Sequence, residues 1–383
     1  MRRSLGAAVV VCVASATALL LAHAAPAQNA PNGPPAGQIA PAMNLEQIKT
    51  PPGLPSLTVT NAAGSVAHLF PTVARAAALR AQNTLYFGGD PPLVYHSGGS
   101  IMPTLTIYNI FWVPPTLQNG GSTGMSNSYG SLMIRLAQDY GGHGIDNNNT
   151  QYFQTIGATT TYIKNSGNFG AFFVDNSAYP ASGCSDSATP GNCITDAQIQ
   201  AEITKVMGIK GWTGGLTHIF MLYTSSGEGS CFDSTSTSCA YTQYCAYHGF
   251  ISGSPDVIYS NMPFGDTTNC QEPGIPSPNG DAVADAVTTA ASHEITEAVT
   301  DPLLNAWFTA GLGYEIGDLC AYDYGNSDTG TFNTYDSGKA NQSWNGHFYE
   351  LQTEFDNHAY AGTGNTKGCV QTGPFALGPS SGL

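Results

Sequence analysis

The sequence predicts a mixed α/β (α+β) fold in which one sheet is covered by helices, and three observations lead to this prediction. Apolar, β-branched segments of strand length alternate along the chain with amphipathic segments of helical length. The last helical segment, residues 281–300, is the longest and ends before a proline. Eight of the nine cysteines follow residue 180, which adds disulfide-stapled loops to the expected fold.

The predicted elements follow one another in the order strand, helix, strands, helix, strand, edge strand and long helix. Runs of β-branched and aromatic residues predict strands at 105–112, 160–163, 171–174, 217–224 and 256–260. Apolar residues at helical spacing, bounded by capping residues, glycine or proline, predict helices at 72–81, 128–140, 195–207 and 281–300. We expect 256–260 at the edge of the sheet, where it can hold a peptide by strand addition.

The first 93 residues differ in character from the rest. Two arginines, an apolar run from Leu5 to Leu21 and small residues before residue 26 predict a secretory signal peptide at 1–25. Residues 26–93 are rich in Pro, Ala and Gly, which is typical of a propeptide, a linker or a wrapping N-terminal arm. Residues 94–383 are expected to form one domain. We therefore expect a secreted protein that does not stay in the membrane once the signal is removed.

The cysteines agree with export. Cys12 lies in the predicted signal peptide, which leaves an even set of eight. In an oxidising compartment an even set indicates disulfides, and the lack of any Cys-x-x-Cys pair in the sequence argues against thiolate zinc ligands. The connectivity stays open, and pairing between near neighbours would join Cys184–Cys193, Cys231–Cys239, Cys245–Cys270 and Cys320–Cys369.

The charge balance narrows the range of partners. The chain has 26 Asp and Glu residues against 11 Lys and Arg residues, a formal net charge of −15. Such acidity argues against nucleic acid or an anionic membrane as partner. Gly-rich phosphate loops are absent from the sequence, and no Gly-x-Ser-x-Gly motif stands between a predicted strand and helix. A protein or peptide substrate, or a cell-wall polymer, is the expected partner.

The candidate chemistry lies in the long predicted helix, at His293-Glu294-Ile295-Thr296-Glu297. His293 and Glu297 are four residues apart, so they project from one face on consecutive turns and can bind one metal ion. Glu294 can reach a water on that ion and take its proton. We predict a zinc site with Glu294 as the catalytic base. A structural calcium site, or an ion pair without a metal, is the alternative.

A third ligand must come from outside the helix. Glu315 lies a short distance downstream and is the favoured candidate, while Asp301, near the predicted end of the helix, competes with it. Asp318 is expected to accept the free ring N–H of His293 and so to orient the imidazole.

Other side chains are weaker candidates. His248, in a cysteine-rich stretch, can be a further ligand or line the site, although packed or solvated histidines are commoner. His218 opens an apolar strand and is expected in the core. The residues that can stabilise an oxyanion are His347, His358, Tyr322 and Tyr324. A cluster of glutamates around the helix would also suit a glycosidase.

The motif with its downstream carboxylates resembles the active site of the gluzincin metallopeptidases. This resemblance implies a zincin-like fold, with His293, Glu297 and Glu315 as zinc ligands and Glu294 as the base. The chain departs from that family at Glu297, where those enzymes carry a second histidine. One histidine with two carboxylates makes a harder and more anionic site, which is less selective for zinc and acidifies bound water less.

A second resemblance covers more of the chain. Several segments resemble secreted phosphate-induced (EXORDIUM-like) proteins, in particular their bacterial branch. These segments are Val94–Gly99, Ile110–Trp112, Gln138–Gly142, His293–Pro302 and Glu315–Cys320. That family is associated with the cell wall and with growth signalling, and it implies a secreted protein without implying a reaction.

Two hypotheses of different class follow. The first is a secreted metal-dependent hydrolase, namely a zinc endopeptidase that uses a metal-bound water. The second is a non-catalytic extracellular or cell-wall-associated protein with a structural metal site or none.

Overall fold

The structure is a computed structural model that describes residues 39–40, 56–83, 93–310, 313–325, 335–362 and 368–371. The predicted signal peptide and most of the predicted propeptide or linker lie outside the described residues. In the described part of the chain, no helix combines the length and apolar character that a membrane span requires.

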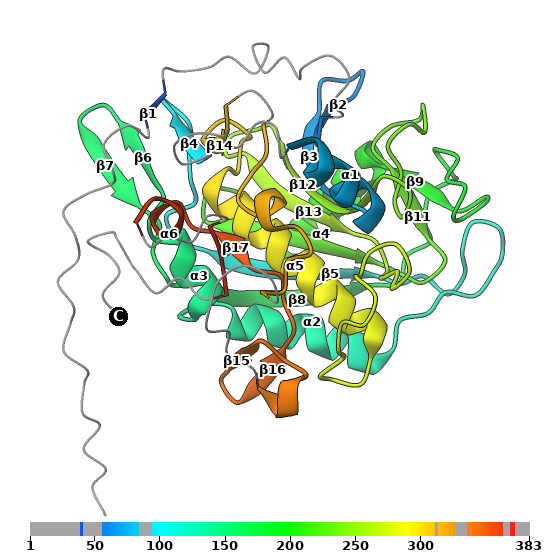
Figure 1. The fold of residues 1–383 in the computed structure, drawn as a ribbon. Helices are drawn as coiled ribbons and strands as arrows, with labels where there is room; N and C mark the ends of the chain where they lie inside the picture. The colour runs from blue at the N-terminus through cyan, green and yellow to red at the C-terminus, as the bar shows by residue number, and fades with distance from the viewer. Residues whose placement is uncertain are drawn as a thin grey trace, which may run out of the picture.

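A seven-stranded sheet in the order β2-β3-β12-β13-β10-β5-β8 forms the centre of the fold (Figure 1). Its strands are β2 (Thr58–Thr60), β3 (Val66–Pro71), β5 (Thr106–Trp112), β8 (Asn168–Asp175), β10 (His218–Thr224), β12 (Tyr244–Ile251) and β13 (Val257–Met262). The strands from β8 to β13 are parallel, whereas β12, β3 and β2 each pair antiparallel with the preceding strand. The predicted mixed sheet is confirmed.

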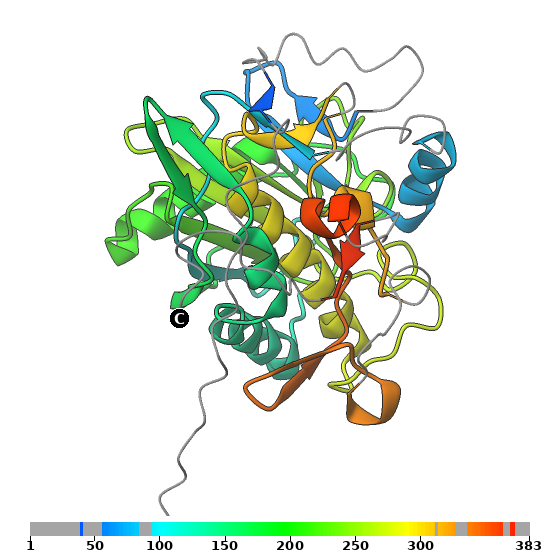
Figure 2. The ribbon, with the colours of Figure 1, turned by 60° about the vertical axis from the view of Figure 1, so that its left-hand side comes forward.

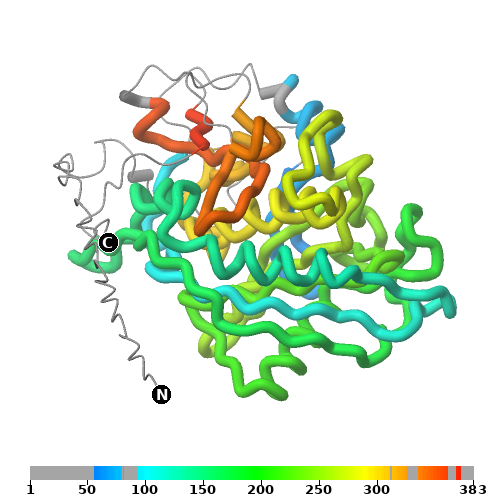
Figure 3. The backbone as a smooth tube through the Cα atoms, turned by 90° about the horizontal axis from the view of Figure 1, so that it is seen from below, coloured from blue at the N-terminus to red at the C-terminus, as the bar shows by residue number. Residues whose placement is uncertain are grey.

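Helices cover both faces of this sheet. They are α1 (Val73–Asn83), α2 (Asn127–Asp139), α3 (Gly144–Asn149), α4 (Asp196–Lys210), α5 (Ala282–Thr300) and α6 (Asn357–Gly362). Alternate residues of β10 show the two layers: Ile219 and Met221 pack with α2 and α5, while Phe220 and Leu222 pack with α4. Seen from below in Figure 3, α2 runs along β5 and β8.

The remaining strands lie outside the seven-stranded sheet. A second sheet contains β1 (Ile39–Ala40), β4 (Leu93–His96) and β14 (Trp307–Thr309). The remaining strands form pairs: β6 (Phe153–Ile156) with β7 (Thr159–Tyr162), β9 (Cys193–Thr195) with β11 (Gly229–Cys231), β15 (Gln342–Trp344) with β16 (His347–Tyr349), and β17 (Glu354–Phe355) with β18 (Cys369–Val370). Two 3-10 helices, η2 (Asp318–Cys320) and η3 (Asp336–Gly338), complete the described elements.

Two features of the sheet differ from the sequence prediction. The segment 256–260 belongs to β13, which is hydrogen-bonded on both sides, so it has no free edge for a peptide. The strand beside it, β12, lies in the cysteine-rich stretch whose mixed composition concealed it. The ordered fold also begins well before residue 94, because β2 and β3 from the predicted propeptide or linker extend the sheet.

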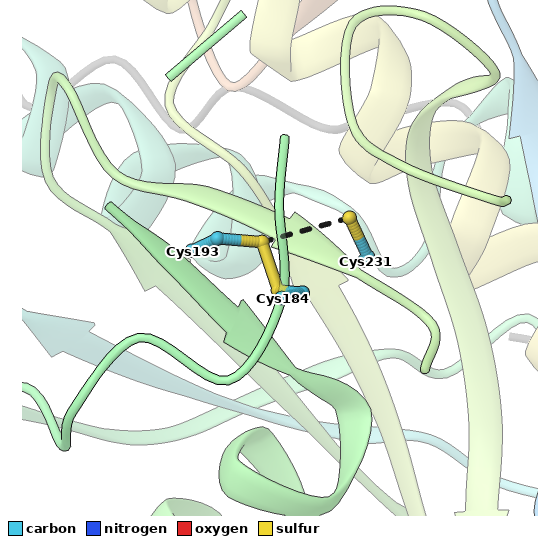
Figure 4. A group of neighbouring side chains, drawn as sticks. All are labelled: Cys184, Cys193 and Cys231. Carbon is cyan, nitrogen blue, oxygen red and sulfur yellow. Dashed lines mark hydrogen bonds between the residues drawn. A yellow bond between two sulfur atoms is a disulfide. The ribbon is translucent and has the colours of Figure 1, made fainter. Parts of the chain in front are cut away.

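Four disulfides join near neighbours among the cysteines: Cys184–Cys193, Cys231–Cys239, Cys245–Cys270 and Cys320–Cys369. The predicted disulfide framework is confirmed. Cys193 Sγ and Cys231 Sγ, from two different bridges, lie 3.5 Å apart (Figure 4). Because each sulfur is already bonded to its own partner, this is a van der Waals contact. These sulfurs carry no thiolate for a metal.

Candidate metal-binding site

Helix α5 carries the predicted motif and is buried along almost its whole length. Asp281 caps the helix by accepting a hydrogen bond from the backbone N–H of Ala284. His293, Glu294 and Glu297 are each 0% exposed. Ionisable groups so far from water need partners within the protein.

Four other parts of the chain contribute side chains next to the motif. His68 of β3 and His248 of β12 are direct partners in the antiparallel register, so they share one face of the sheet. Their ring centroids are 5.9 Å apart. Glu315 and Asp318 come from the segment that leads into η2, and Glu354 comes from β17. All five side chains are almost inaccessible to solvent.

Glu297 is central to the cluster because it belongs to two groups of potential metal ligands. It joins His68 and Asp318 in the first group and His248 and Glu315 in the second, with ligand atoms within 4.8 Å of one another in each. His68 Nε2 lies 2.6 Å from Asp318 Oδ2. His248 Nε2 lies 3.7 Å from Glu315 Oε2, and its Nδ1 lies 3.7 Å from Glu297 Oε2. Each group can close around one cation.

Glu294 is anchored by one of its two carboxylate oxygens. His248 Nδ1 and Glu294 Oε2 lie 3.1 Å apart and share a hydrogen bond. Among the described groups, none hydrogen bonds to Glu294 Oε1. A backbone hydrogen bond at Phe70 of β3 also reaches this carboxylate, so His248 and β3 orient it together.

The two ring nitrogens of His293 have different neighbours. Nε2 lies 3.1 Å from Glu297 Oε1 and 4.0 Å from Asp318 Oδ1. Nδ1 lies 2.8 Å from the side-chain nitrogen of Gln352. The nitrogen that we expected to meet Asp318 is therefore contacted by Gln352 instead. Asp318 lies on the opposite side of the ring, next to His68, because η2 approaches from the side of β3.

Gly317 leaves the space that His293 occupies. A Cβ at this position would lie 2.5 Å from His293 Nδ1 and 2.9 Å from Glu297 Oε1. Such distances are shorter than real Cβ contacts, so any larger residue would displace the motif. The glycine lets the chain before η2 pass directly over the helix.

Burial and mutual repulsion disfavour charge on the glutamates of the cluster. Burial, reinforced by the neighbouring carboxylates, raises the pKa of Glu294, Glu297, Glu315 and Glu354 well above the ordinary value. Burial thus favours the protonated form of these groups when no cation is bound.

The histidines respond to burial in two ways. Burial lowers the pKa of His293 to about 4 and that of His248 well below its usual value. Burial also acts to lower the pKa of His68, but the charge and the hydrogen bond of Asp318 outweigh it and raise that pKa. His293 and His248 are thus neutral at pH 7, the form in which an imidazole binds a metal.

Buried carboxylate oxygens that accept no hydrogen bond make the cluster suited to a cation. No described group hydrogen bonds to one oxygen in each of six buried carboxylates: Glu294, Glu297, Asp301, Glu315, Asp318 and Glu354. Each unsatisfied buried group costs about 1–3 kcal/mol. A divalent cation would satisfy several of these oxygens together and replace the bound protons. Imidazole nitrogens suit zinc, and the carboxylate majority also suits harder ions.

The structure brings together five of the predicted site residues. His293, Glu294, Glu297, Glu315 and Asp318 all lie in the cluster. The roles that we assigned to them stay predictions.

Asp301, the competing ligand, lies at the end of α5. One of its carboxylate oxygens accepts hydrogen bonds from the backbone N–H groups of Asn305 and Ala306. It belongs to neither of the ligand groups around Glu297.

The sequence interpretation missed His68, Gln352 and Glu354. His68 lies within the segment interpreted as a propeptide or linker. The alternation along β3 is a signal that could have identified it: Ala67 and Leu69 pack with the α4 layer, while Phe70 packs with the α5 layer. Gln352 and Glu354 lie near short strands that have no sequence pattern of their own.

The weaker candidates lie in varied places. His248 is in the cluster. His218 is only partly buried, and its Nδ1 contacts the carbonyl of Thr213. His347 pairs with Asp139 on α2. The hydroxyl of Tyr322 donates to the backbone carbonyl of Pro71 at the end of β3.

Fold and cluster together define a disulfide-bonded α/β protein with a buried histidine–carboxylate site. Residues 228–356 match the family model described as "Phosphate-induced protein 1 conserved region". The matched stretch includes β12, α5 and the segment with Glu315 and Asp318, and it ends just after β17. The chain is thus similar to phosphate-induced proteins over this stretch, and the stretch holds most of the cluster. β3 and His68 lie outside it.

Two relatives from Arabidopsis thaliana are similar to shorter stretches. Protein EXORDIUM-like 3 is 30% identical over 112 residues, which cover 24% of this chain and 33% of the relative. Protein EXORDIUM-like 5 is 38% identical over 58 residues, which cover 14% of this chain and 16% of the relative. The chain thus spans no more than about a third of the length of these curated relatives. No solved structure matches the chain.

Proposed function

We propose that this protein is a secreted metal-dependent hydrolase, a zinc endopeptidase of zincin-like architecture. The observation that carries the proposal is the buried cluster on α5, where uncommitted carboxylate oxygens surround His293, Glu294 and Glu297. The disulfides are typical of extracellular proteins and support secretion.

The arrangement of the sheet supports the zincin-like part of the proposal. Helix α5 packs against β12 and β13, and it crosses the sheet diagonally in Figure 1. β12 runs antiparallel to β13 and brings His248 to the cluster. An antiparallel strand beside a metal site is suited to align an extended peptide through backbone hydrogen bonds.

Under this proposal His293, Glu297 and Glu315 hold the ion, and His248 is a further ligand because it completes a group with Glu297 and Glu315. When bound there, zinc would supply a water of lowered pKa and polarise a substrate carbonyl. The residues of the chain orient these partners and exclude other water.

Glu294 moves the proton. Its Oε1 takes a proton from the attacking water and delivers it to the leaving nitrogen of the peptide. His248 fixes the carboxylate through Oε2, so that Oε1 keeps one direction. The dry surroundings strengthen these interactions.

One observation favours the second candidate function, a structural metal site in a non-catalytic protein. The motif residues are 0% exposed, so substrate has no path to them while β3 is in place. A carboxylate-rich buried site of this kind also suits calcium.

Glu294→Gln separates the two functions. Metal content is measured by mass spectrometry, and cleavage of a quenched-fluorescent peptide is followed with and without a chelator. An endopeptidase should lose activity by about 100-fold to 10,000-fold while it retains its metal. Glu202→Gln, a buried glutamate on α4 on the other face of the sheet, is the matched control and should keep both. Metal without cleavage in all three proteins would favour the structural site, and absence of metal would refute both readings.

A further inference from the structure

The edge of the sheet beside the cluster is already occupied by the chain's own N-terminal segment. β12 pairs with β13 on one side and with β3 on the other. Without β3 and β2, β12 would be the edge strand at this end of the sheet. β3 is extended and antiparallel to β12, with His68 opposite His248 and Phe70 opposite Ala246. A peptide added to β12 would take this same path.

β3 also fills the site with side chains. His68 Nε2 lies 2.6 Å from Asp318 Oδ2, and its Nδ1 lies 3.3 Å from Glu315 Oε1. The ring of Phe70 lies 4.1 Å from the ring of His293. Two residues of one strand thus contact three residues of the cluster, and a bound substrate would have to displace them.

Residues 56–83 form one end of the large sheet together with the helix that follows it. β2 pairs with β3, and α1 follows directly, so the three elements lie at the same end of the sheet in Figures 1 and 2. The segment contains no cysteine, so no disulfide ties it to the rest of the chain. The other five strands, from β12 to β8, are hydrogen-bonded to one another without a break.

We propose that β3 is an internal substrate mimic, and that the chain with residues 56–83 in place is the latent form of the enzyme; this inference rests on the proposed peptidase function. The segment binds along β12 as an extended peptide substrate would. His68 takes up carboxylates that the metal and substrate need. The substrate class is an extended peptide with an apolar residue at the position of Phe70, whose ring lies against His293.

The experiment uses the whole chain with one cut. Residues 86–90, between α1 and β4, are replaced by the recognition sequence of a site-specific protease, and the folded protein is cut there. All residues of 56–83 and of the rest of the described chain stay present, but 56–83 is then held to the rest only by non-covalent contacts. Cleavage of a quenched-fluorescent peptide is measured before and after the cut over a dilution series, with the metal content of each sample.

A latent enzyme should gain about tenfold or more in specific activity on cutting and dilution, as the segment dissociates by mass action. A synthetic peptide of residues 56–83 should restore inhibition, and the same peptide with His68→Ala should inhibit at least about tenfold less well. His218→Ala in the cut chain is the control, because this partly buried residue lies at the start of β10 and should change nothing. The peptide with His68→Gln is a second variant, because Gln keeps a polar side chain of similar length. It should also inhibit less well than the unchanged peptide, which would rule out a general loss of peptide structure in His68→Ala as the cause.

The outcomes distinguish the two proposals. Equal activity before and after the cut, with no effect of the added peptide, would overturn the latent form and leave the peptidase standing. Loss of metal and activity on dilution would also overturn it, because His68 would then be a working ligand. Absence of cleavage in every form, with metal bound, would refute the peptidase itself.

Discussion

Gly317→Ala is the most direct test of the packing around the motif. Gly317 has φ −76° and ψ −37°, a helical conformation that alanine adopts without strain. Any effect of the substitution must therefore come from the added methyl group. That group would lie 2.5 Å from His293 Nδ1 and 2.9 Å from Glu297 Oε1. His293 cannot move freely, because Phe70 lies against its ring and Gln352 contacts Nδ1.

Two opposing effects set the size of the change. Overpacking a filled interior costs about 1–3 kcal/mol. The loss of freedom in the unfolded chain that accompanies Gly→Ala offsets about 0.4–1 kcal/mol of this. We expect a net loss of about 1–2 kcal/mol in the free energy of unfolding. Displacement of His293 and Glu297 should also weaken metal binding by about 10-fold to 100-fold, as disturbance of ligand orientation usually does.

The assay compares urea midpoints with metal affinity, the latter from competition with a chromogenic chelator. Gly208→Ala is the matched control, because Gly208 lies within α4 and a Cβ there meets nothing within 4 Å. This control should gain about 0.5–1 kcal/mol through helix propensity. If Gly317→Ala matched Gly208→Ala in stability and the wild type in metal affinity, the close approach of η2 to the motif would be wrong.

Two further predictions concern the scaffold. Burial raises the pKa of Asp146 to about 7, so the folded chain keeps a proton that the unfolded chain loses near pH 4, and stability falls as pH rises between these values. Asp146→Asn mimics the protonated acid and should bring the urea midpoints at about pH 5 and about pH 8 closer together; an unchanged gap would contradict the buried acid. Replacing Cys320 and Cys369 by serine opens a bridge over 49 positions and should cost about 4 kcal/mol in chain entropy. The same replacement should weaken metal binding, because the bridge holds η2, which carries Asp318, in place. Unchanged metal affinity would show that other contacts hold η2 without the bridge.

The long, periodic elements could be predicted from sequence because local pattern determines them. The expected helix at 281–300 corresponds to α5, and the expected helix at 128–140 corresponds to α2. β12 could not be recognised, because its cysteine, tyrosines and His248 lack the alternation of a half-buried strand. The order of strands depends on pairing between distant segments. For this reason the sequence predicted β13 at an edge of the sheet, whereas the edge strands are β2 and β8.

In the candidate site, too, sequence reasoning found the residues that are close in sequence and missed the distant ones. Helical spacing placed His293 and Glu297 together, and proximity in sequence suggested Glu315 and Asp318. His68 could not be found by such reasoning, because it joins the cluster through β3 from a segment of linker-like composition. The contact of Gln352 with His293 likewise depends on how the last described strands fold back over α5.

The hydrogen bond between His68 and Asp318 joins positions 250 residues apart, which has a consequence for folding. During synthesis β3 precedes its partner β12 by more than half of the folded part of the chain. Closing so long a loop costs entropy that only late contacts repay, so this pairing belongs to the slow end of folding. A cation that binds the completed cluster stabilises the finished chain by mass action and leaves early intermediates unaffected. Added metal should therefore lower the rate of unfolding far more than it changes the rate of folding.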